Sequence, residues 1–214
     1  MKEKAIVFDL DGTLWDATKV LIQAWNFVLK KHNLKEVGYE TFCSLMGMTN
    51  DEISKAGIYS EIPEEDREKI IKEAEQLSSL FLKRSNLKPY DGLKESLDRL
   101  VQDFDFYIVS NCYKGYIETF IEVTKYGYYF DDFICEEETK LSKAQNINIV
   151  LQRNRIASAV FVGDRESDKE AAEKAKLPFI HAAYGFDKNV KTQYKIDSPK
   201  DLVDVINKIY GTNY

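Results

Sequence analysis

Apolar residues are arranged differently before and after about residue 90 of this 214-residue chain. After residue 90, short apolar runs rich in branched and aromatic side chains alternate with segments whose apolar positions recur every three or four residues. The first arrangement is typical of buried strands, and the second of helices that pack on one face. Such an alternation predicts an α/β fold, in which a parallel sheet carries helices on both faces.

The same patterns give approximate bounds for the elements. We expect strands at residues 4–10, 104–110, 131–135, 158–163 and 178–183. We expect helices at residues 92–101, 115–126, 142–154, 167–176 and 199–210. Ligands of parallel sheets bind beyond the carboxyl ends of the strands, so the residues that follow each strand are the candidates for chemistry.

The region 15–88 contains helical patterns but no convincing strand. Apolar positions that share a helical face are Leu21, Trp25 and Val28, and further along Ile70, Ala74, Leu77 and Phe81. Thr49 and Glu52 form a capping box for a short helix that Gly57 would end, and Pro63 suits the start of a longer one. Because turn-like segments flank the region, we expect residues 15–88 to form an inserted helical domain and residues 1–14 with 89–214 to form the α/β domain.

Two aspartates stand at the carboxyl end of the first strand, where its apolar run stops. Asp9 and Asp11 are two residues apart, so strand alternation predicts that both side chains point the same way. A pair of carboxylates at the end of a buried strand favours a hard divalent cation such as Mg²⁺, which binds few protein carboxylates together with a phosphate. Gly12 allows a tight turn after them. The alternative for this string alone is an ordinary Asp-Gly turn.

A second acidic cluster follows the strand expected at residues 158–163. Asp164 stands directly after this strand, as Asp9 does after the first. Ser167 and Glu170 have the spacing of a capping box, so we expect a helix to begin just after Ser167. Asp168 would then lie in its first turn, where the helix dipole alone could explain an acid and a metal site is the other interpretation.

Two further segments suit phosphate oxygens. Ser110 and Asn111 end the strand expected at residues 104–110, where a hydroxyl and free amides can bind an anion. Lys143 follows a plausible helix N-cap, Ser142, and a lysine in the first turn of a helix is unfavourable unless an anion lies nearby. Lys140 is the competing candidate.

In this order, the four segments resemble the four motifs of the haloacid dehalogenase-like hydrolase superfamily over essentially the whole chain. The resemblance implies a Rossmann-like core with a helical cap inserted between the first two motifs. It implies that Asp9 is the nucleophile and Asp11 the general acid/base, with Ser110, Asn111 and Lys143 binding phosphate. It also implies that Asp164 and Asp168 form the acidic metal motif, with Mg²⁺ held by Asp9, Asp164 and the backbone carbonyl of Asp11, and with Asp168 holding Lys143 or a metal-bound water.

The chemistry that follows is hydrolysis of a small phosphate monoester through an aspartyl phosphate on Asp9. A sugar-phosphate mutase of the same superfamily is the main alternative, although the cap loops show no obvious paired basic residues. A dehalogenase is disfavoured because it needs neither Asp11 nor a metal cluster. A silent binding module is disfavoured because no essential acid is missing.

The substrate is less well determined. In many relatives with this cap, a basic residue stands four positions before the glycine that matches Gly47, but here that position is Cys43. This departure weakens the case for a carboxylate-bearing substrate such as phosphoglycolate. Sugar phosphates, phosphoglycolate and nucleoside monophosphates all stay open, and the oligomeric state is not predicted.

Composition adds limits on partners and location. The formal net charge is −6, and no basic stripe suggests a nucleic-acid partner. No apolar run is long enough for a membrane span and no signal peptide is evident, so we expect a cytoplasmic protein. The three cysteines show no metal or disulfide spacing, and Cys112 and His181 are expected to be structural.

Overall fold

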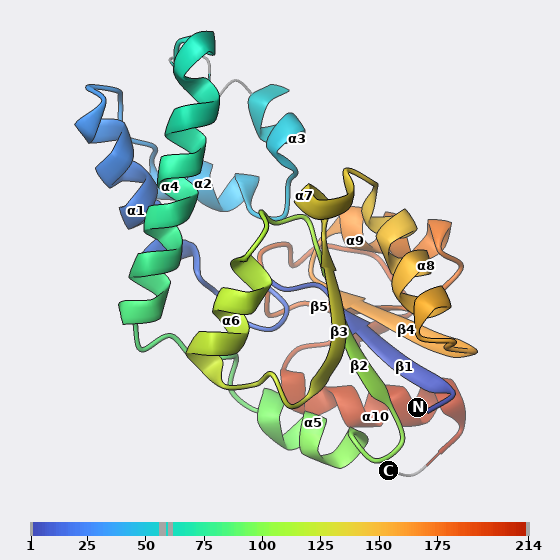
Figure 1. Ribbon diagram of the computed structural model, residues 1–214. Coiled ribbons are helices and arrows are strands. Elements are labelled where there is room, and N and C mark those ends of the chain that lie inside the picture. Colours follow the sequence, from blue (N-terminus) through green and yellow to red (C-terminus); the bar gives the residue numbers. More distant parts are fainter. Residues whose placement is uncertain (1, 56–58, 60–61, 213–214) are drawn as a thin grey trace.

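A parallel sheet of six strands lies at the centre of the structure, a computed structural model that describes residues 2–55, 59 and 62–212 (Figure 1). The strand order is β3-β2-β1-β4-β5-β6, and every neighbouring pair is parallel. The strands are β1 (Lys4–Phe8), β2 (Asp105–Ser110), β3 (Phe130–Cys135), β4 (Ser158–Gly163), β5 (Phe179–Ala182) and β6 (Tyr194–Ile196).

Helices connect these strands and follow the last one. The helices of the first part of the chain are α1 (Thr18–Lys31), α2 (Tyr39–Leu45), α3 (Asn50–Lys55) and α4 (Glu64–Arg84). Those of the second part are α5 (Leu93–Leu100), α6 (Tyr116–Thr124), α7 (Glu136–Thr139), α8 (Lys143–Arg153), α9 (Glu166–Lys174) and α10 (Leu202–Tyr210), with a 3₁₀ turn η1 (Pro199–Asp201) before the last.

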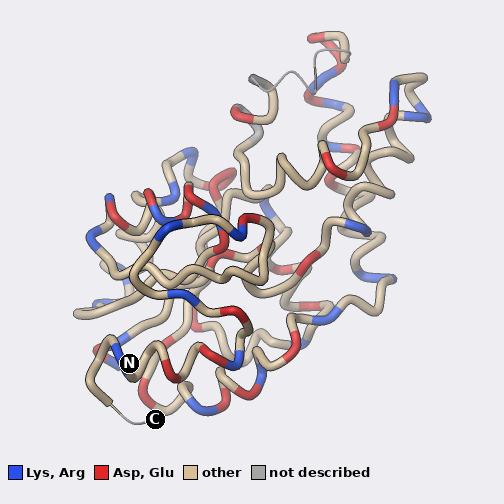
Figure 2. Tube along the Cα trace, turned by 180° about the vertical axis from the view of Figure 1, so that it is seen from behind, with Lys and Arg blue, Asp and Glu red and all other residues tan. Residues whose placement is uncertain are grey.

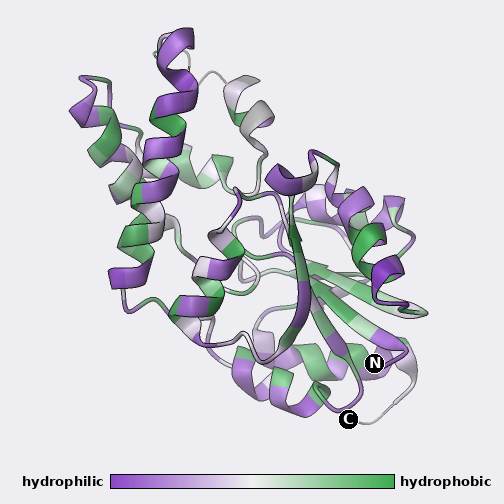
Figure 3. Ribbon diagram, viewed as in Figure 1, coloured by the Kyte–Doolittle hydropathy of each residue, from purple (hydrophilic) through white to green (hydrophobic). Residues whose placement is uncertain are grey.

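The sheet buries both of its faces, as the strand pattern predicts. Ile6 and Phe8 of β1 pack with α5, α6 and α10, whereas Ala5 and Val7 pack with α8 and α9 on the opposite face. Because both faces are covered, the central strands β1 and β4 are mostly apolar (Figure 3), whereas β3 at one edge of the sheet carries two aspartates. The expected α/β fold with helices on both faces is therefore confirmed.

The helices α1 to α4 lie to one side of the sheet, beyond the carboxyl ends of its strands (Figure 1). Helices α1 and α4 pack against each other around a small apolar core of their own. That core includes Val28 and Leu29 of α1 and Ile70 and Ala74 of α4, so the helical faces predicted for both helices are the buried ones. α4 begins at Glu64, directly after Pro63.

Two chain segments join this helical region to the sheet, and they lie side by side. The Tyr90 N–H donates to the Leu14 carbonyl at 3.0 Å, and Trp15 forms an isolated antiparallel bridge with Pro89. Trp15 is fully buried and packs against Phe120 of α6, with ring centroids 5.0 Å apart. The helical region therefore leaves and re-enters the sheet region through one narrow neck.

Several expected bounds differ from the observed ones. β1 ends at Phe8 and not at residue 10, so Asp9 lies just beyond its strand. The three-residue strand β6 and the four-residue helix α7 are absent from the sequence prediction, because such short elements show no period. The Thr49–Glu52 capping box is present, with the Thr49 N–H donating to the Glu52 carboxylate at 2.8 Å. Gly57, the expected end of that helix, lies outside the described residues.

Charges of both signs alternate over the surface of the molecule. Figure 2 shows Lys and Arg interspersed with Asp and Glu along the trace. None of the helices in the described ranges is long and apolar enough to cross a membrane. His181 is fully buried in β5 and its ring Nε2 lies 2.7 Å from the Asp187 carbonyl, as expected for a structural residue.

Candidate active site

The site is built around the carboxyl end of β1, a central strand of the sheet. Asp9 follows this strand and is 2% exposed. Its N–H donates to the Val162 carbonyl of β4 at 2.9 Å, which extends the parallel pairing by one residue. The backbone of Asp9 is thus held by the sheet, so the position of its side chain is well defined.

Lys143 reaches the same point from the first turn of α8. Ser142 caps this helix: its side chain accepts from the Gln145 N–H at 3.4 Å, and the Ser142 N–H donates to the Gln145 side chain at 3.0 Å. The Lys143 ammonium donates to Asp9 Oδ1 at 2.7 Å and to Asp168 Oδ1 at 2.6 Å. A buried lysine between two carboxylates explains how a cation is tolerated at a helix N-terminus. Within the part of the chain that the structure describes, it is Lys143 and not the competitor Lys140 that bonds to these two aspartates.

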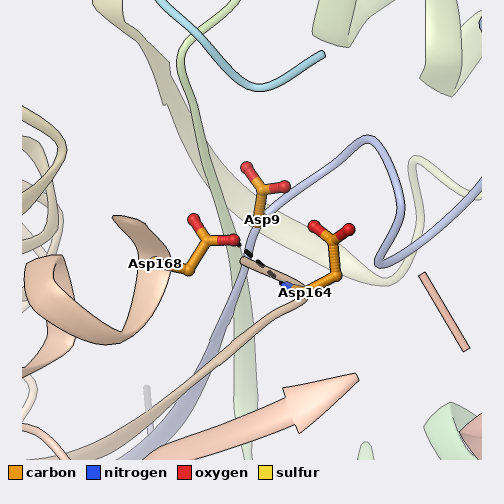
Figure 4. A group of neighbouring side chains, drawn as sticks. All are labelled: Asp9, Asp164 and Asp168. Carbon is orange, nitrogen blue, oxygen red and sulfur yellow. Dashed lines mark hydrogen bonds between the residues drawn. The ribbon is translucent and has the colours of Figure 1, made fainter. Parts of the chain in front are cut away.

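Asp9, Asp164 and Asp168 meet at the ends of β1 and β4 (Figure 4). Each offers one carboxylate oxygen, and these atoms all lie within 4.8 Å of one another. Asp168 Oδ2 also accepts from the N–H groups of Asp164 and Arg165, both at 3.1 Å. These two bonds orient Asp168 toward the cluster.

The expected start of the helix after Ser167 is wrong. α9 begins at Glu166, and Asp168 accepts the free N–H groups that precede it, so Ser167 and Glu170 are not its cap. The prediction failed because the Asp168 carboxylate, and not the Ser167 hydroxyl, accepts hydrogen bonds from the N–H groups of the turn before the helix.

Asp164 lies under a loop that sequence reasoning missed. The Phe186 N–H donates to Asp164 Oδ2 at 2.6 Å, and Gly12 and Gly185 pack so closely around this carboxylate that a Cβ on either would overlap it. Gly12 also has a φ of +84°, which favours glycine. Gly185, which lies just beyond β5, was the one signal in the sequence that the backbone passes close to another group here.

Asp11 is turned toward a different neighbour. Its Oδ1 accepts from the Tyr116 hydroxyl at 2.7 Å, and its carboxylate is not among the three that converge. Since β1 ends at Phe8, strand alternation does not extend to Asp11, so the rule from which parallel Asp9 and Asp11 side chains were expected does not apply there. Tyr116 is a further residue that the sequence did not signal, because it lies 105 positions away.

Burial changes the proton affinity of the acids. Desolvation raises the pKa of Asp11 to about 8, against the smaller lowering effect of the Tyr116 hydrogen bond. Desolvation also raises the pKa of Asp9 to about 6, and the charge of Lys143 opposes it. Burial lowers the pKa of Lys143, but the charges of Asp168 and Asp9 outweigh burial and raise it. Lys143 is therefore charged, and of Asp9 and Asp11 the latter is better suited to carry a proton.

The remaining predicted site residues end β2. Ser110 is its last residue and is buried beside the site. The Asn111 side-chain amide donates to the Gly47 carbonyl of the helical region at 3.0 Å, while its Oδ1 is buried without a partner in the described structure. Asn111 thus joins the sheet to the helical region.

Arg165 makes a second such connection. Its guanidinium donates to the Cys43 carbonyl at 2.8 Å and lies 5.3 Å from the centre of the Phe186 ring. Cys43 is the position whose lack of a basic side chain weakens the case for a carboxylate-bearing substrate, and Arg165 brings a cation to its backbone. Nothing in the sequence around either residue indicates this contact.

Comparison with known proteins agrees with this geometry. The sequence pattern of the haloacid dehalogenase-like hydrolases matches residues 6–182. A phosphoglycolate phosphatase of Nitrosospira multiformis is 23% identical over 202 residues, which cover 91% of this chain and 88% of that protein.

Two solved structures share the fold. A predicted phosphoglycolate phosphatase from Haemophilus somnus superposes with a TM-score of 0.83 at 19% identity, covering 96% of this chain and 99% of that one. CbbY from Rhodobacter sphaeroides, solved with xylulose-1,5-bisphosphate, has a TM-score of 0.81 at 14% identity, covering 94% and 96%. The match to the family spans most of the sequence and confirms the resemblance predicted from the motifs: the chain belongs to the haloacid dehalogenase-like hydrolase family.

Proposed function

We propose that the chain is a phosphatase that hydrolyses a small phosphate monoester through an aspartyl phosphate on Asp9. The observation that carries this proposal is the buried contact of Lys143 with Asp9 and Asp168 beside Asp164. It combines a nucleophile, a fixed cation and an acidic cluster at one strand end. The phosphoglycolate phosphatases among its relatives support the reaction class.

The residues fit a magnesium ion. The Oδ1 atom of Asp164 is buried and has no hydrogen-bond partner in the described structure, although it lies in an acidic cluster. Carboxylate and carbonyl oxygens are the ligands that Mg²⁺ prefers. Asp9, Asp164 and the Asp11 carbonyl would hold the ion, and Asp168, already bonded to Lys143 and two N–H groups, would orient the others. Bound there, the ion supplies positive charge to the phosphate oxygens.

The reaction then divides between the protein's own groups. An Asp9 oxygen attacks phosphorus while the bond to the alcohol oxygen breaks, and protonated Asp11 gives its proton to that oxygen. Lys143 and Ser110 neutralise the phosphoryl oxygens. Asp11, now a carboxylate, takes a proton from the attacking water, and the bond between Asp9 and phosphorus breaks to release phosphate. Tyr116 holds Asp11 in position throughout.

The helical region, residues 15–88, would act as a cap domain over the core formed by residues 1–14 and 89–214. Asn111 and Arg165 contact its backbone at Gly47 and Cys43, so the closed arrangement is held from the core side. A closed cap excludes water during the first step and contacts the alcohol part of the substrate. A cytoplasmic location stays a prediction from the sequence.

The mutase alternative is less well supported. A mutase must hold a second phosphate of its bisphosphate intermediate, which requires cations near the alcohol side of the site. Among the described residues that line the cavity beside Asp11, there is no Lys, Arg or His. The silent-module alternative is disfavoured because Asp9, Asp11, Lys143 and Asp164 are all present and buried.

An assay with p-nitrophenyl phosphate and Mg²⁺ tests the proposal. We expect release of free phosphate without any bisphosphate activator, and loss of turnover in excess chelator that added Mg²⁺ restores. Asp9→Asn should lower turnover by at least about 10⁴-fold, because the amide is similar in size but cannot attack phosphorus. Thermal unfolding of this variant is the control for folding. Full turnover by Asp9→Asn, or in chelator, would contradict the assignment.

A further inference from the structure

Two of the three cysteines come from neighbouring segments at the carboxyl end of the sheet. Cys135 is the last residue of β3 and stands opposite Ser110 in the pairing of β2 with β3. Cys112 follows Ser110 by two residues, and its carbonyl accepts from the Glu137 N–H at 3.5 Å. The backbones that carry the two cysteines therefore stay together beyond the ends of their strands.

The thiols of Cys112 and Cys135 are in contact. Both side chains belong to the apolar cluster that covers one face of the sheet, and the two thiols share a hydrogen bond. The third cysteine, Cys43 of α2, has its thiol beside the Tyr39 hydroxyl instead. Two thiols in contact need only a small movement to reach the S–S distance of about 2 Å. Because the pair is far apart in the sequence, its spacing predicts no disulfide.

The two thiols differ in acidity. The hydrogen bond from Cys112 lowers the pKa of Cys135, and this effect exceeds that of burial. Burial raises the pKa of Cys112. Since the thiolate is the nucleophile in cysteine chemistry, Cys135 is the sulfur that reacts first with an oxidant. Cys112 is then the neighbouring thiol that completes a disulfide.

A small oxidant has access to the pair. Cys112 is partly exposed and borders the cavity beside Asp11, whose volume is about 110 Å³. A water molecule takes up about 30 Å³ in the liquid, and hydrogen peroxide is only slightly larger. The cavity therefore has room for a peroxide molecule next to Cys112.

The pair is also joined to the end of β2 that is expected to bind phosphate. The Cys112 thiol shares a hydrogen bond with the Ser110 hydroxyl, and Asn111 between them donates to the Gly47 carbonyl. Residues 111 and 112 lie in no helix or strand, so this short segment can move without the sheet. A disulfide would remove the thiol hydrogen and draw Cys112 toward Cys135. The surroundings of the Ser110 hydroxyl would then change.

We propose that Cys112 and Cys135 form a reversible disulfide on reaction with a peroxide, and that this bond weakens phosphate binding at Ser110. The second part rests on the proposed phosphatase function. The first part rests on the pairing of β2 with β3 and on the contact between the two thiols.

The chemistry balances with peroxide as the oxidant. The Cys135 thiolate attacks one peroxide oxygen, the O–O bond breaks, and hydroxide leaves behind a sulfenic acid on Cys135. The Cys112 sulfur attacks the Cys135 sulfur, the S–O bond breaks, and the Cys112 proton leaves with the oxygen as water. Hydroxide takes up the proton that Cys135 had released. Two thiols and one peroxide thus give one disulfide and two water molecules.

Mass spectrometry after treatment with hydrogen peroxide tests the first part. We expect the chain to lose two hydrogen atoms and to keep one of its three thiols when titrated in denaturant. A digest without reductant should contain peptides joined through Cys112 and Cys135, and dithiothreitol should separate them. Cys112→Ser and Cys135→Ser should each prevent this cross-link. Cys43→Ser is the matched control and should retain it.

Turnover of p-nitrophenyl phosphate tests the second part. We expect the oxidised protein to have a KM about fivefold higher, the loss expected when one hydrogen bond to the phosphate is weakened. Dithiothreitol should restore the original value. Cys112→Ser and Cys135→Ser, each compared with itself before and after peroxide, should show no reversible change. Cys43→Ser should respond as the unaltered chain does.

Three free thiols after peroxide treatment, or a cross-link that includes Cys43 or a second chain, would overturn the inference. A Cys112–Cys135 cross-link with an unchanged KM would refute its connection to phosphate binding and leave the phosphatase proposal standing. If neither form hydrolyses p-nitrophenyl phosphate, the phosphatase proposal fails. The mass and the digest of the unaltered chain would still decide whether the two cysteines are an oxidisable pair.

Discussion

The carboxyl end of the sheet and the helical region next to it differ in the kind of contacts that they make. At the sheet edge, Asp9, Lys143 and Asp168 are joined by contacts of 2.6–2.7 Å, and backbone N–H groups orient the acids. On the helical side, the Trp25 and Tyr59 rings stack with centroids 5.9 Å apart beside a cavity, and the Tyr59 hydroxyl has no partner in the described structure. Under the proposed function, the carboxyl end of the sheet would carry out the reaction, and the helical side would select the molecule that undergoes it.

The two sides also differ in how their positions are fixed. Because β1, β2 and β4 are parallel neighbours, Asp9, Ser110 and Asp164 lie together at the carboxyl end of the sheet. This placement depends on backbone pairing and not on the packing of particular side chains. The helical side depends on packing between α1 and α4 and on contacts such as that of Asn111 with the Gly47 carbonyl. Substitutions on the sheet side should therefore change turnover of every ester, and substitutions on the helical side should change stability or preference.

Among substitutions that test this comparison, the largest expected change in turnover concerns Asp11, which borders both regions. Asp11→Asn should lower steady-state turnover by about 1,000-fold, because the amide can neither protonate the alcohol oxygen nor take a proton from water. An aryl phosphate, whose oxygen departs unaided, should still give a burst of released phenol before turnover stalls. Rapid-quench measurement of that burst checks the division of labour. Equal loss of the first step for alkyl and aryl esters would mean that Asp11 is chiefly structural.

A smaller effect tests the rigidity of the sheet edge. Gly185→Ala should lower the free energy of unfolding by about 3 kcal/mol, because the new Cβ would overlap the Gly12 carbonyl and the Asp164 side chain. Turnover should fall as well, since Asp164 must move. Gly38→Ala is the matched control, because its Cβ would meet nothing within 4 Å. Chemical denaturation of both variants is the measurement, and equal stability would refute the tight packing of this loop.

The smallest effect concerns the apolar core of the helical region. Val28→Ala should lower the free energy of unfolding by about 2 kcal/mol, because it leaves a cavity at a fully buried position between α1 and α4. Turnover of p-nitrophenyl phosphate by the folded protein should stay within about twofold of the unaltered chain. A large loss of turnover without a loss of stability would show that the two regions are not independent in the way proposed.

The sequence was most informative where a feature is local. The strand ends at Asp9, Ser110 and Asp164 follow from apolar runs that stop at polar residues, and the Ser142 cap follows from its spacing to Gln145. These features depend on a few neighbouring residues, so pattern and capping rules apply to them directly.

Features that join distant segments could not be predicted in this way. Nothing near Tyr116 indicates that its hydroxyl contacts Asp11, and nothing near Arg165 indicates that it reaches Cys43. The surroundings of the Asp11 side chain could not be predicted for the same reason, because they depend on where β1 ends and on which tyrosine lies nearby. The strand β6 forms only because β5 offers it a partner, since its three residues carry no period.

The narrow neck at Leu14, Trp15, Pro89 and Tyr90 has a consequence for how this chain tolerates change. The two connecting segments are hydrogen-bonded to each other. Relative to the sheet, the whole helical region is therefore a long loop whose two ends are held together. The closure entropy of such a loop grows only slowly with its length. Helices between residues 15 and 88 could therefore be lengthened, shortened or exchanged for other helices with little penalty to the sheet, so descendants of one ancestral core could diversify in recognition while their chemistry stayed unchanged.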